Sequence, residues 1–222
     1  MNNDGHRQRL REKYLKGGIE GFLDYEILEL FLTYASPRKE CKAKSKELIE
    51  KIGSLEGAFN APKEKLLEIE DMGNASYILI KLFKDIQKYI YKEDKLRGRK
   101  ISSTKELIEY LNYDMANLQV EVFKIIFLDT QNVFINEKTI VVGTIDKSYI
   151  YPRELLKEIF EHNAKSVIFA HNHPSGNLNP SKADINFTNS MRSLLKELEI
   201  NLLDHVIIGT SGHYSFLEEN LL

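Results

Sequence analysis

The first ninety residues carry the hydrophobic spacing of helices. In "DYEILELFLTYA", residues 24–35, apolar positions recur at intervals of three and four residues, the period of an amphipathic helix with Asp24 as the expected N-cap. A helix over residues 6–18 ends in a glycine pair, and another runs from the proline to the glycine of residues 37–53. Residues 62–91 combine a short helix, a hairpin at "DMGN" and a longer amphipathic helix. Because no stretch alternates with a period of two, this part is predicted to be all-helical.

The second half of the chain mixes the two periods. Its apolar runs are short and rich in β-branched and aromatic residues, and they alternate with helical patterns. This arrangement predicts an α/β or α+β domain of about 120 residues, a normal size for one core. Strand-like segments occupy residues 119–129, 133–143, 165–173, 201–209 and 213–218, and helical segments occupy residues 151–163 and 181–199.

A charged stretch separates these halves. "YKEDKLRGRKISST", residues 91–104, contains Gly98 and few apolar residues, so it is interpreted as a linker. We therefore expect two domains, a helical domain over residues 1–98 and a mixed domain over residues 101–222.

Composition and charge narrow the class of protein. Cys41 is the only cysteine, so an internal disulfide and a thiolate-based zinc site are excluded and a reducing compartment is expected. The N-terminus lacks a signal-peptide pattern, and no segment approaches the roughly 18 apolar residues of a membrane span. We expect a soluble, cytoplasmic protein with no membrane contact.

Charge is distributed unevenly between the predicted domains. Residues 1–100 carry a net charge of +4, whereas residues 101–222 carry −6. The difference suggests separate partners for the two parts. An excess of four positive charges is well below the strongly basic surface of a dedicated nucleic-acid-binding protein.

Two histidines at the end of an apolar run are the most informative chemical feature. His171 and His173 stand at i and i+2 of the predicted strand over residues 165–173, so their side chains lie on one face. A turn-rich loop then leads to the next helix, and Asp184 lies in its first turn. Two imidazoles and one carboxylate leave a fourth tetrahedral position open, which is typical of a catalytic zinc site.

These residues also have structural interpretations. A histidine at a strand end is often solvated or buried for packing, and two at this spacing are a weak metal signal by themselves. Ser181 and Asp184 fit the S-x-x-D pattern of a helix capping box. Both roles are compatible, because the Asp184 carboxylate has two oxygens.

The complete spacing adds specificity. His171-x-His173, seven residues, Ser181, two residues and Asp184 resemble the JAMM motif of the JAB/MPN metalloprotease family at every motif position. The surrounding segments resemble the bacterial RadC-like branch of that family, and the resemblance covers nearly the whole chain. The segments that carry it are "GHRQRLREKYLKGG", "DYEILELFLTYA", "GTID", "YPRE", "AHNHPSGNLNPSKAD" and "LLDHVIIG".

The resemblance implies a fold and a mechanism. It implies a helical N-terminal domain followed by a cytidine-deaminase-like JAB/MPN domain with a mixed central sheet flanked by helices. His171, His173 and Asp184 would bind one Zn²⁺ per chain together with a water molecule whose pKa falls to about 7. Glu121 would accept the proton of that water and pass it to the leaving amine, and Ser181 would help to stabilise the oxyanion.

Other residues near the motif receive less weight. Glu121 shares a strand face with Phe123, which makes a buried functional carboxylate and a solvated strand end equally open interpretations on the residues alone. Asp204 and His205 match the family pattern but are expected to support the site and not to bind the ion, because a strand directs them to opposite faces. No role is assigned to Asn172.

The hairpin at residues 71–74 resembles a helix-hairpin-helix element, in which glycines and helical N–H groups contact a DNA phosphate. Gly73, Asn74 and Lys81 are the candidate DNA-contacting residues. Asp71 replaces the first glycine of that pattern and would repel a phosphate, and basic side chains near the turn are sparse. A hairpin that serves packing alone is the competing interpretation.

Three hypotheses about function follow. The first is a zinc-dependent hydrolase of the RadC-like JAB/MPN family that cleaves peptide or isopeptide bonds of an unknown peptide or protein substrate. The second is a DNA-associated repair or recombination protein, with non-specific DNA binding or metal-dependent nuclease activity. The third is an assembly module that binds a protein partner without catalysis.

Overall fold

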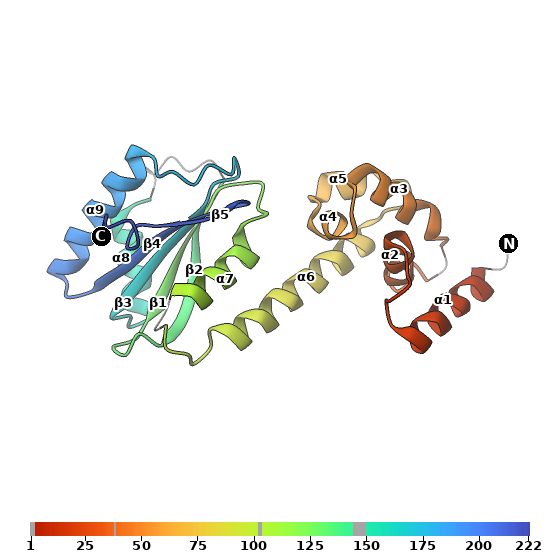
Figure 1. The fold of residues 1–222 in the computed structure, drawn as a ribbon, viewed down its shortest axis with the longest axis horizontal. Coiled ribbons are helices and arrows are strands. Elements are labelled where there is room, and N and C mark those ends of the chain that lie inside the picture. Colours follow the sequence, from red (N-terminus) through yellow and green to blue (C-terminus); the bar gives the residue numbers. More distant parts are fainter. Residues whose placement is uncertain (1–2, 38, 102–103, 144–149) are drawn as a thin grey trace. The chain divides into compact units, whose positions relative to one another are not determined.

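The computed structural model describes residues 3–37, 39–101, 104–143 and 150–222 (Figure 1). The chain divides into two compact units, Met1–Gln87 and Lys88–Leu222. This division falls earlier than the expected one between residues 98 and 101. Most of the "GTID" segment lies outside the described residues.

The first unit is built from helices, as predicted. Leu28, Leu48, Leu66 and Ile80 are among the apolar side chains of its core. Its elements are α1 (Asn3–Gly17), α2 (Asp24–Leu32), α3 (Lys42–Ile52), α4 (Leu55–Asn60), α5 (Lys63–Leu67) and the first part of α6 (Asn74–Lys95).

Two predicted helix starts in this unit are wrong. Asp24 is the first residue of α2, and its carboxylate accepts a hydrogen bond from the backbone N–H of Leu55 at 3.0 Å, so it does not serve as the N-cap. The helix predicted from Pro37 begins only at Lys42. Its end is as expected, because Gly53 adopts a φ of +98° that other residues avoid.

The linker prediction is also wrong in part. Residues 91–95 form the end of α6, and Leu96 directly after it is fully buried in the second unit. The charged side chains of this segment concealed one anchoring leucine. A further helix that the hydrophobic pattern did not predict, α7 (Thr104–Met115), follows the segment.

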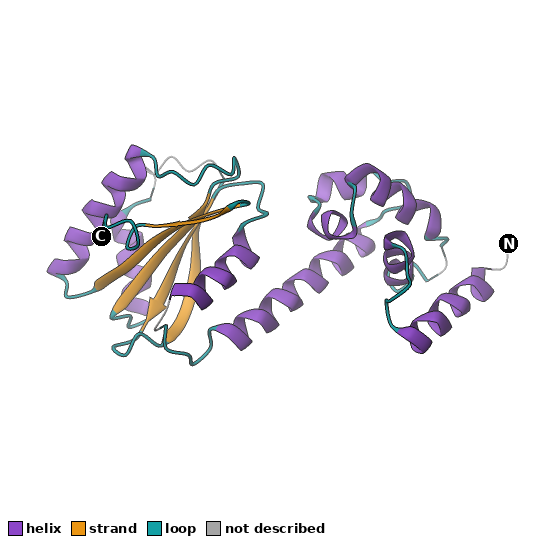
Figure 2. Cartoon of the chain, viewed as in Figure 1, coloured by secondary structure: helices purple, strands orange, loops and turns teal. Residues whose placement is uncertain are grey.

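The second unit contains a five-stranded sheet in the order β2-β1-β3-β4-β5 (Figure 2). All neighbouring strands are antiparallel except β3 and β4, which are parallel. The mixed sheet that the family resemblance implied is therefore confirmed. The strands are β1 (Val122–Leu128), β2 (Phe134–Val142), β3 (Ser166–Asn172), β4 (Asn201–Gly209) and β5 (Gly212–Ser215).

Helices cover both faces of this sheet. On one face, Leu107 and Leu111 of α7 pack against Ile126 of β1. On the other face, the apolar sides of α8 (Pro152–Glu161) and α9 (Lys182–Glu197) pack against the phenylalanines of β1 and β3. β1 and β3 are therefore buried along their whole length, and most of their residues are apolar. Among the described residues, no helix combines the length and the apolar character needed to cross a bilayer.

One charged group interrupts the core beneath α7. Lys124 of β1 is 3% exposed, and its ammonium contacts the carboxylates of Asp114 and Glu137. Tyr110 donates a hydrogen bond of 2.6 Å to Glu137. Burial lowers the pKa of Lys124, but the two carboxylates outweigh that effect and raise it above its usual value. Lys124 is therefore a permanently charged member of the core.

Lys124→Met is expected to destabilise the second unit. The change removes the buried cation between the Asp114 and Glu137 carboxylates and leaves them only the more exposed Lys88 and Lys92, so the cost should approach the roughly 3–5 kcal/mol of a broken buried ion pair. Urea denaturation followed by circular dichroism measures the loss. Lys81→Met is the control, because it removes an exposed ion pair with Asp85 and should cost less than about 1 kcal/mol. Equal losses in the two variants would contradict the structural role of Lys124.

Candidate metal centre

The end of β3 places two imidazoles beside α9. His171 is the penultimate residue of β3 and is 1% exposed, whereas His173 follows the strand and its side chain is 14% exposed. Their Nε2 atoms lie 3.0 Å apart. The Nδ1 atom of His173 lies 2.6 Å from the carbonyl oxygen of Asn177, which can only accept a hydrogen bond. In its neutral form, His173 therefore carries its proton on Nδ1 and directs the lone pair of Nε2 toward His171.

Asp184 is held by the start of α9. Ser181 is the N-cap, and its hydroxyl oxygen accepts the backbone N–H of Asp184 at 3.1 Å. The Oδ2 atom of Asp184 accepts the backbone N–H of Ser181 at 2.7 Å and its hydroxyl at 2.5 Å. The other oxygen, Oδ1, lies 3.1 Å from Nε2 of His171. One carboxylate thus takes part in the capping box and in the histidine cluster.

These three side chains could hold a metal ion. One ligand atom from each of His171, His173 and Asp184 lies within 4.8 Å of the other two. A tetrahedral zinc ion with bonds of about 2.0–2.1 Å needs ligand atoms roughly 3.3 Å apart. The distances of 3.0 and 3.1 Å from Nε2 of His171 to its two neighbours are close to that requirement.

Glu121 lies at the edge of the same cluster. It directly precedes β1 and is half-buried, so it lies at a strand end, one of the two positions open from the sequence. Phe123 pairs with His171 in antiparallel register, which brings the chain before β1 alongside His173. Glu121, His173, Ser181 and Asp184 line one cavity of about 380 Å³. The Glu121 carboxylate, the partly exposed His173 imidazole and the Ser181 hydroxyl therefore line the same cavity.

Asn172, which lies between the two histidines, holds the backbone around Glu121. Its buried side chain accepts the N–H of Val122 at 2.8 Å and donates to the carbonyl oxygens of Val120 at 3.1 Å and Leu118 at 3.4 Å. These bonds reach the residues on both sides of Glu121. Sequence reasoning missed this role, although a buried amide on the face opposite the histidines was a signal for it.

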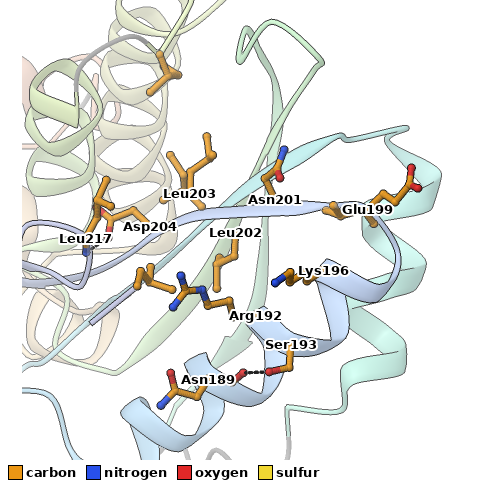
Figure 3. A pocket seen from close by; sticks show the side chains of 14 residues that line it. Asn189, Arg192, Ser193, Lys196, Glu199, Asn201, Leu202, Leu203, Asp204 and Leu217 are labelled. Atoms are coloured by element: carbon orange, nitrogen blue, oxygen red, sulfur yellow. Dashed lines mark hydrogen bonds between the residues drawn. The ribbon is translucent and has the colours of Figure 1, made fainter. Parts of the chain in front are cut away.

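A larger cavity of about 980 Å³ lies between the beginning of β4 and the second half of α9 (Figure 3). Arg192 and Lys196 of α9 and Leu202 of β4 line it, but none of the side chains of the histidine cluster does. The buried carboxylate of Asp204 accepts hydrogen bonds from the backbone N–H groups of His205 and Leu217.

Asp204 therefore supports the fold, as expected from the sequence. Its carboxylate also accepts the hydroxyl of Ser215 at 2.6 Å. Burial raises the pKa of Asp204 above its usual value, although these hydrogen bonds act in the opposite direction. His205, on the other face of β4, contacts His171 at the back of the cluster.

The candidate DNA-contacting residues lie at the start of α6. Asn74 is its first residue and Gly73 precedes it, whereas Lys81 lies further along the helix, paired with Asp85 at 2.8 Å. Asp71 adopts a φ of +61°, the left-handed conformation that a glycine would take without strain. The turn thus has the geometry expected of a glycine at Asp71 but carries a carboxylate.

Basic side chains are closer to this turn than the sequence indicated. Lys39 forms an ion pair of 2.6 Å with Asp71 and holds the pKa of its carboxyl below the usual value. Lys44 lies 3.4 Å from the Asp71 carbonyl oxygen. Both lysines precede the hairpin by more than twenty residues, so a search near the turn could not find them.

Comparison with known proteins identifies relatives over the whole chain. A protein-family model described as a RadC-like JAB domain matches residues 101–221. The chain is 43% identical to UPF0758 protein FN0909 of Fusobacterium nucleatum, covering 99% of this chain and 98% of the relative. It is 36% identical to UPF0758 protein SPO0054 of Ruegeria pomeroyi, over 98% and 97% of the two chains. These names state no activity, so the chemistry must be argued from the residues.

Asn172→Ala is expected to lower stability by on the order of 3 kcal/mol, because it leaves buried backbone groups around Glu121 without their partners. Hydrogen exchange at the Val122 amide should accelerate accordingly. Asn189→Ala is the control, since Asn189 is an exposed asparagine. Unchanged protection of Val122 in Asn172→Ala would refute the assignment.

Proposed function

Because the chain belongs to the RadC-like JAB family, we propose that it is a zinc-dependent hydrolase that cleaves peptide or isopeptide bonds. The observation that carries the proposal is the convergence of His171, His173 and Asp184, of which His173 and Asp184 line the same cavity as Glu121. The substrate is a peptide or protein whose identity depends on the loops around that cavity. The proposal includes a cytoplasmic location, consistent with a single buried cysteine.

The donor set fits zinc. Two imidazole nitrogens and a carboxylate oxygen are the ligands of many catalytic zinc sites, and they leave one position open. His171, His173 and Asp184 would hold one ion per chain. A cation also offsets the electrostatic cost of burying the Asp184 carboxylate against two imidazoles whose lone pairs face inward.

The reaction assigns separate tasks to the cavity side chains. A zinc ion bound there supplies Lewis acidity, which lowers the pKa of a coordinated water molecule to about 7. Glu121 would accept the proton of the attacking water and return it to the leaving amine, a role supported by its position in the cavity wall. Ser181 now donates its hydroxyl proton to Asp184, so it must release that carboxylate before it can donate to the oxyanion. Its contribution therefore requires a rotation of the hydroxyl.

Two substitutions separate the ligand role from the proton-transfer role. His173→Ala should lose the zinc content of about one ion per chain that we expect of the wild-type protein. Glu121→Gln should keep the zinc and reduce hydrolysis of a peptide library about 10²–10⁴-fold. Atomic absorption and mass spectrometry of the cleaved peptides measure the two effects.

Glu219→Gln provides the matched control, because Glu219 is exposed and outside the cavity. Equal zinc content in wild type and His173→Ala would refute the metal centre. Full activity of Glu121→Gln would refute the assigned proton transfer. If the wild-type protein and the Glu121→Gln and Glu219→Gln variants all bind zinc but hydrolyse no peptide, the result would favour an assembly module that binds a partner without catalysis.

A second candidate function is non-specific DNA contact by the first unit. The supporting observation is the turn before α6, where Gly73 and Asn74 start a long helix and Lys39 lies beside Asp71. Helical N–H groups and a nearby ammonium suit a phosphate. Asp71 opposes such binding, because its carboxylate pairs with Lys39 and adds negative charge.

Asp71→Asn should therefore strengthen DNA binding. Asparagine tolerates the left-handed conformation, and the change releases Lys39 for a phosphate. We expect about 5-fold tighter binding to a DNA duplex at low salt, with one additional counterion released in a salt titration. Glu47→Gln releases Lys51 from a comparable exposed pair and is the control. Equal affinities of Asp71→Asn and the control would rule out a phosphate contact at this turn.

A further inference from the structure

His205 lies behind His171, away from the cavity. It is fully buried in β4, and its ring stacks on Phe216 with centroids 4.8 Å apart. Phe123 and Phe169 also pack against it. Aromatic rings surround the imidazole, so its two nitrogens are costly to bury unless each has a partner. Both have one: Nε2 lies 2.9 Å from Nδ1 of His171, and Nδ1 lies 2.6 Å from Oγ1 of Thr188.

The hydroxyl of Thr188 determines the direction of these bonds. Its single proton is donated to the carbonyl oxygen of Asp184 at 2.7 Å, the common bond from a helical threonine to the residue four positions earlier. The oxygen of Thr188 therefore presents a lone pair to His205, and Nδ1 of His205 carries the proton. Nε2 of His205 then accepts the proton of Nδ1 of His171. As a result, Nε2 of His171 carries a lone pair directed at His173 and Asp184.

We propose that His205 and Thr188 are positioning residues that fix His171 in the tautomer able to bind a cation through Nε2. The inference rests on the proposed zinc centre and deepens it. The relay begins at the backbone of Asp184 and ends at His171, so it also links the two elements that carry ligands. The reverse tautomers would place a proton on Nε2 of His171, at the position where the ion binds.

Zinc affinity of the full-length chain tests the relay without a substrate. Thr188→Val keeps the shape of the side chain but removes the hydroxyl, and His205→Phe keeps the aromatic packing but removes both nitrogens. Partners of this kind typically contribute 10–100-fold to metal affinity. Calorimetric titration with zinc should show a 10–100-fold weaker Kd for His205→Phe and a smaller loss for Thr188→Val. Thr188→Ser should restore the wild-type value.

His213→Phe is the matched control, because it removes a partly exposed histidine of β5 from the same sheet. A tautomer readout complements the affinities: nitrogen NMR of the zinc-loaded protein should place the protons of His171 and His205 on Nδ1. A proton on Nε2 of His205 would overturn the relay even if His205→Phe failed to fold. If Thr188→Val and His205→Phe both bind zinc with wild-type affinity, the relay is overturned but the proposed zinc centre is not. If the wild-type chain binds no zinc, the proposed function is overturned as well.

Discussion

The arrangement of the second unit depends on one shared carboxylate. Oδ2 of Asp184 caps α9 together with Ser181, and Oδ1 faces His171 at 3.1 Å. The cap determines where α9 begins, and the apolar side of α9 then packs on the face of β1 and β3 that carries the histidines. Because the Asp184 side chain joins the start of α9 to the end of β3, a substitution there would disturb both the helix cap and the histidine cluster.

Two further groups of residues support the histidine cluster, one from the core behind it and one from the opposite face of β3. His171 and Asp184 form the buried side of the cluster, and His205 with Thr188 supports it from within the core. On the other face of β3, Asn172 holds the backbone that leads to Glu121. Residues 171–173, at the end of β3, therefore position two imidazoles and, through the hydrogen bonds of Asn172, the backbone around Glu121 just before β1.

Much of this fold could be predicted from periodicity, and the failures have physical causes. The strands of the second unit were predicted because they are buried and apolar, whereas the mixed sheet was implied by the family resemblance. The linker prediction failed where the charged end of α6 hides the buried Leu96. Long-range contacts, such as His171 with His205 and Lys39 with Asp71, join residues more than thirty positions apart. Local patterns do not contain such pairings. Strand alternation predicted that His171 and His173 share a face, and the resemblance to the JAMM motif added Asp184 to them.

The uneven exposure of the three side chains affects the order in which an ion and a substrate could enter the site. His173 is 14% exposed, but His171 and Asp184 are 1% exposed, so the Glu121 cavity is the way in among the described residues. The proposed zinc ion and polypeptide substrate would have to enter through the same cavity, and the ion would have to bind first. Occupancy by a polypeptide would then trap the ion, and its exchange with the surrounding solution would stop until the products leave.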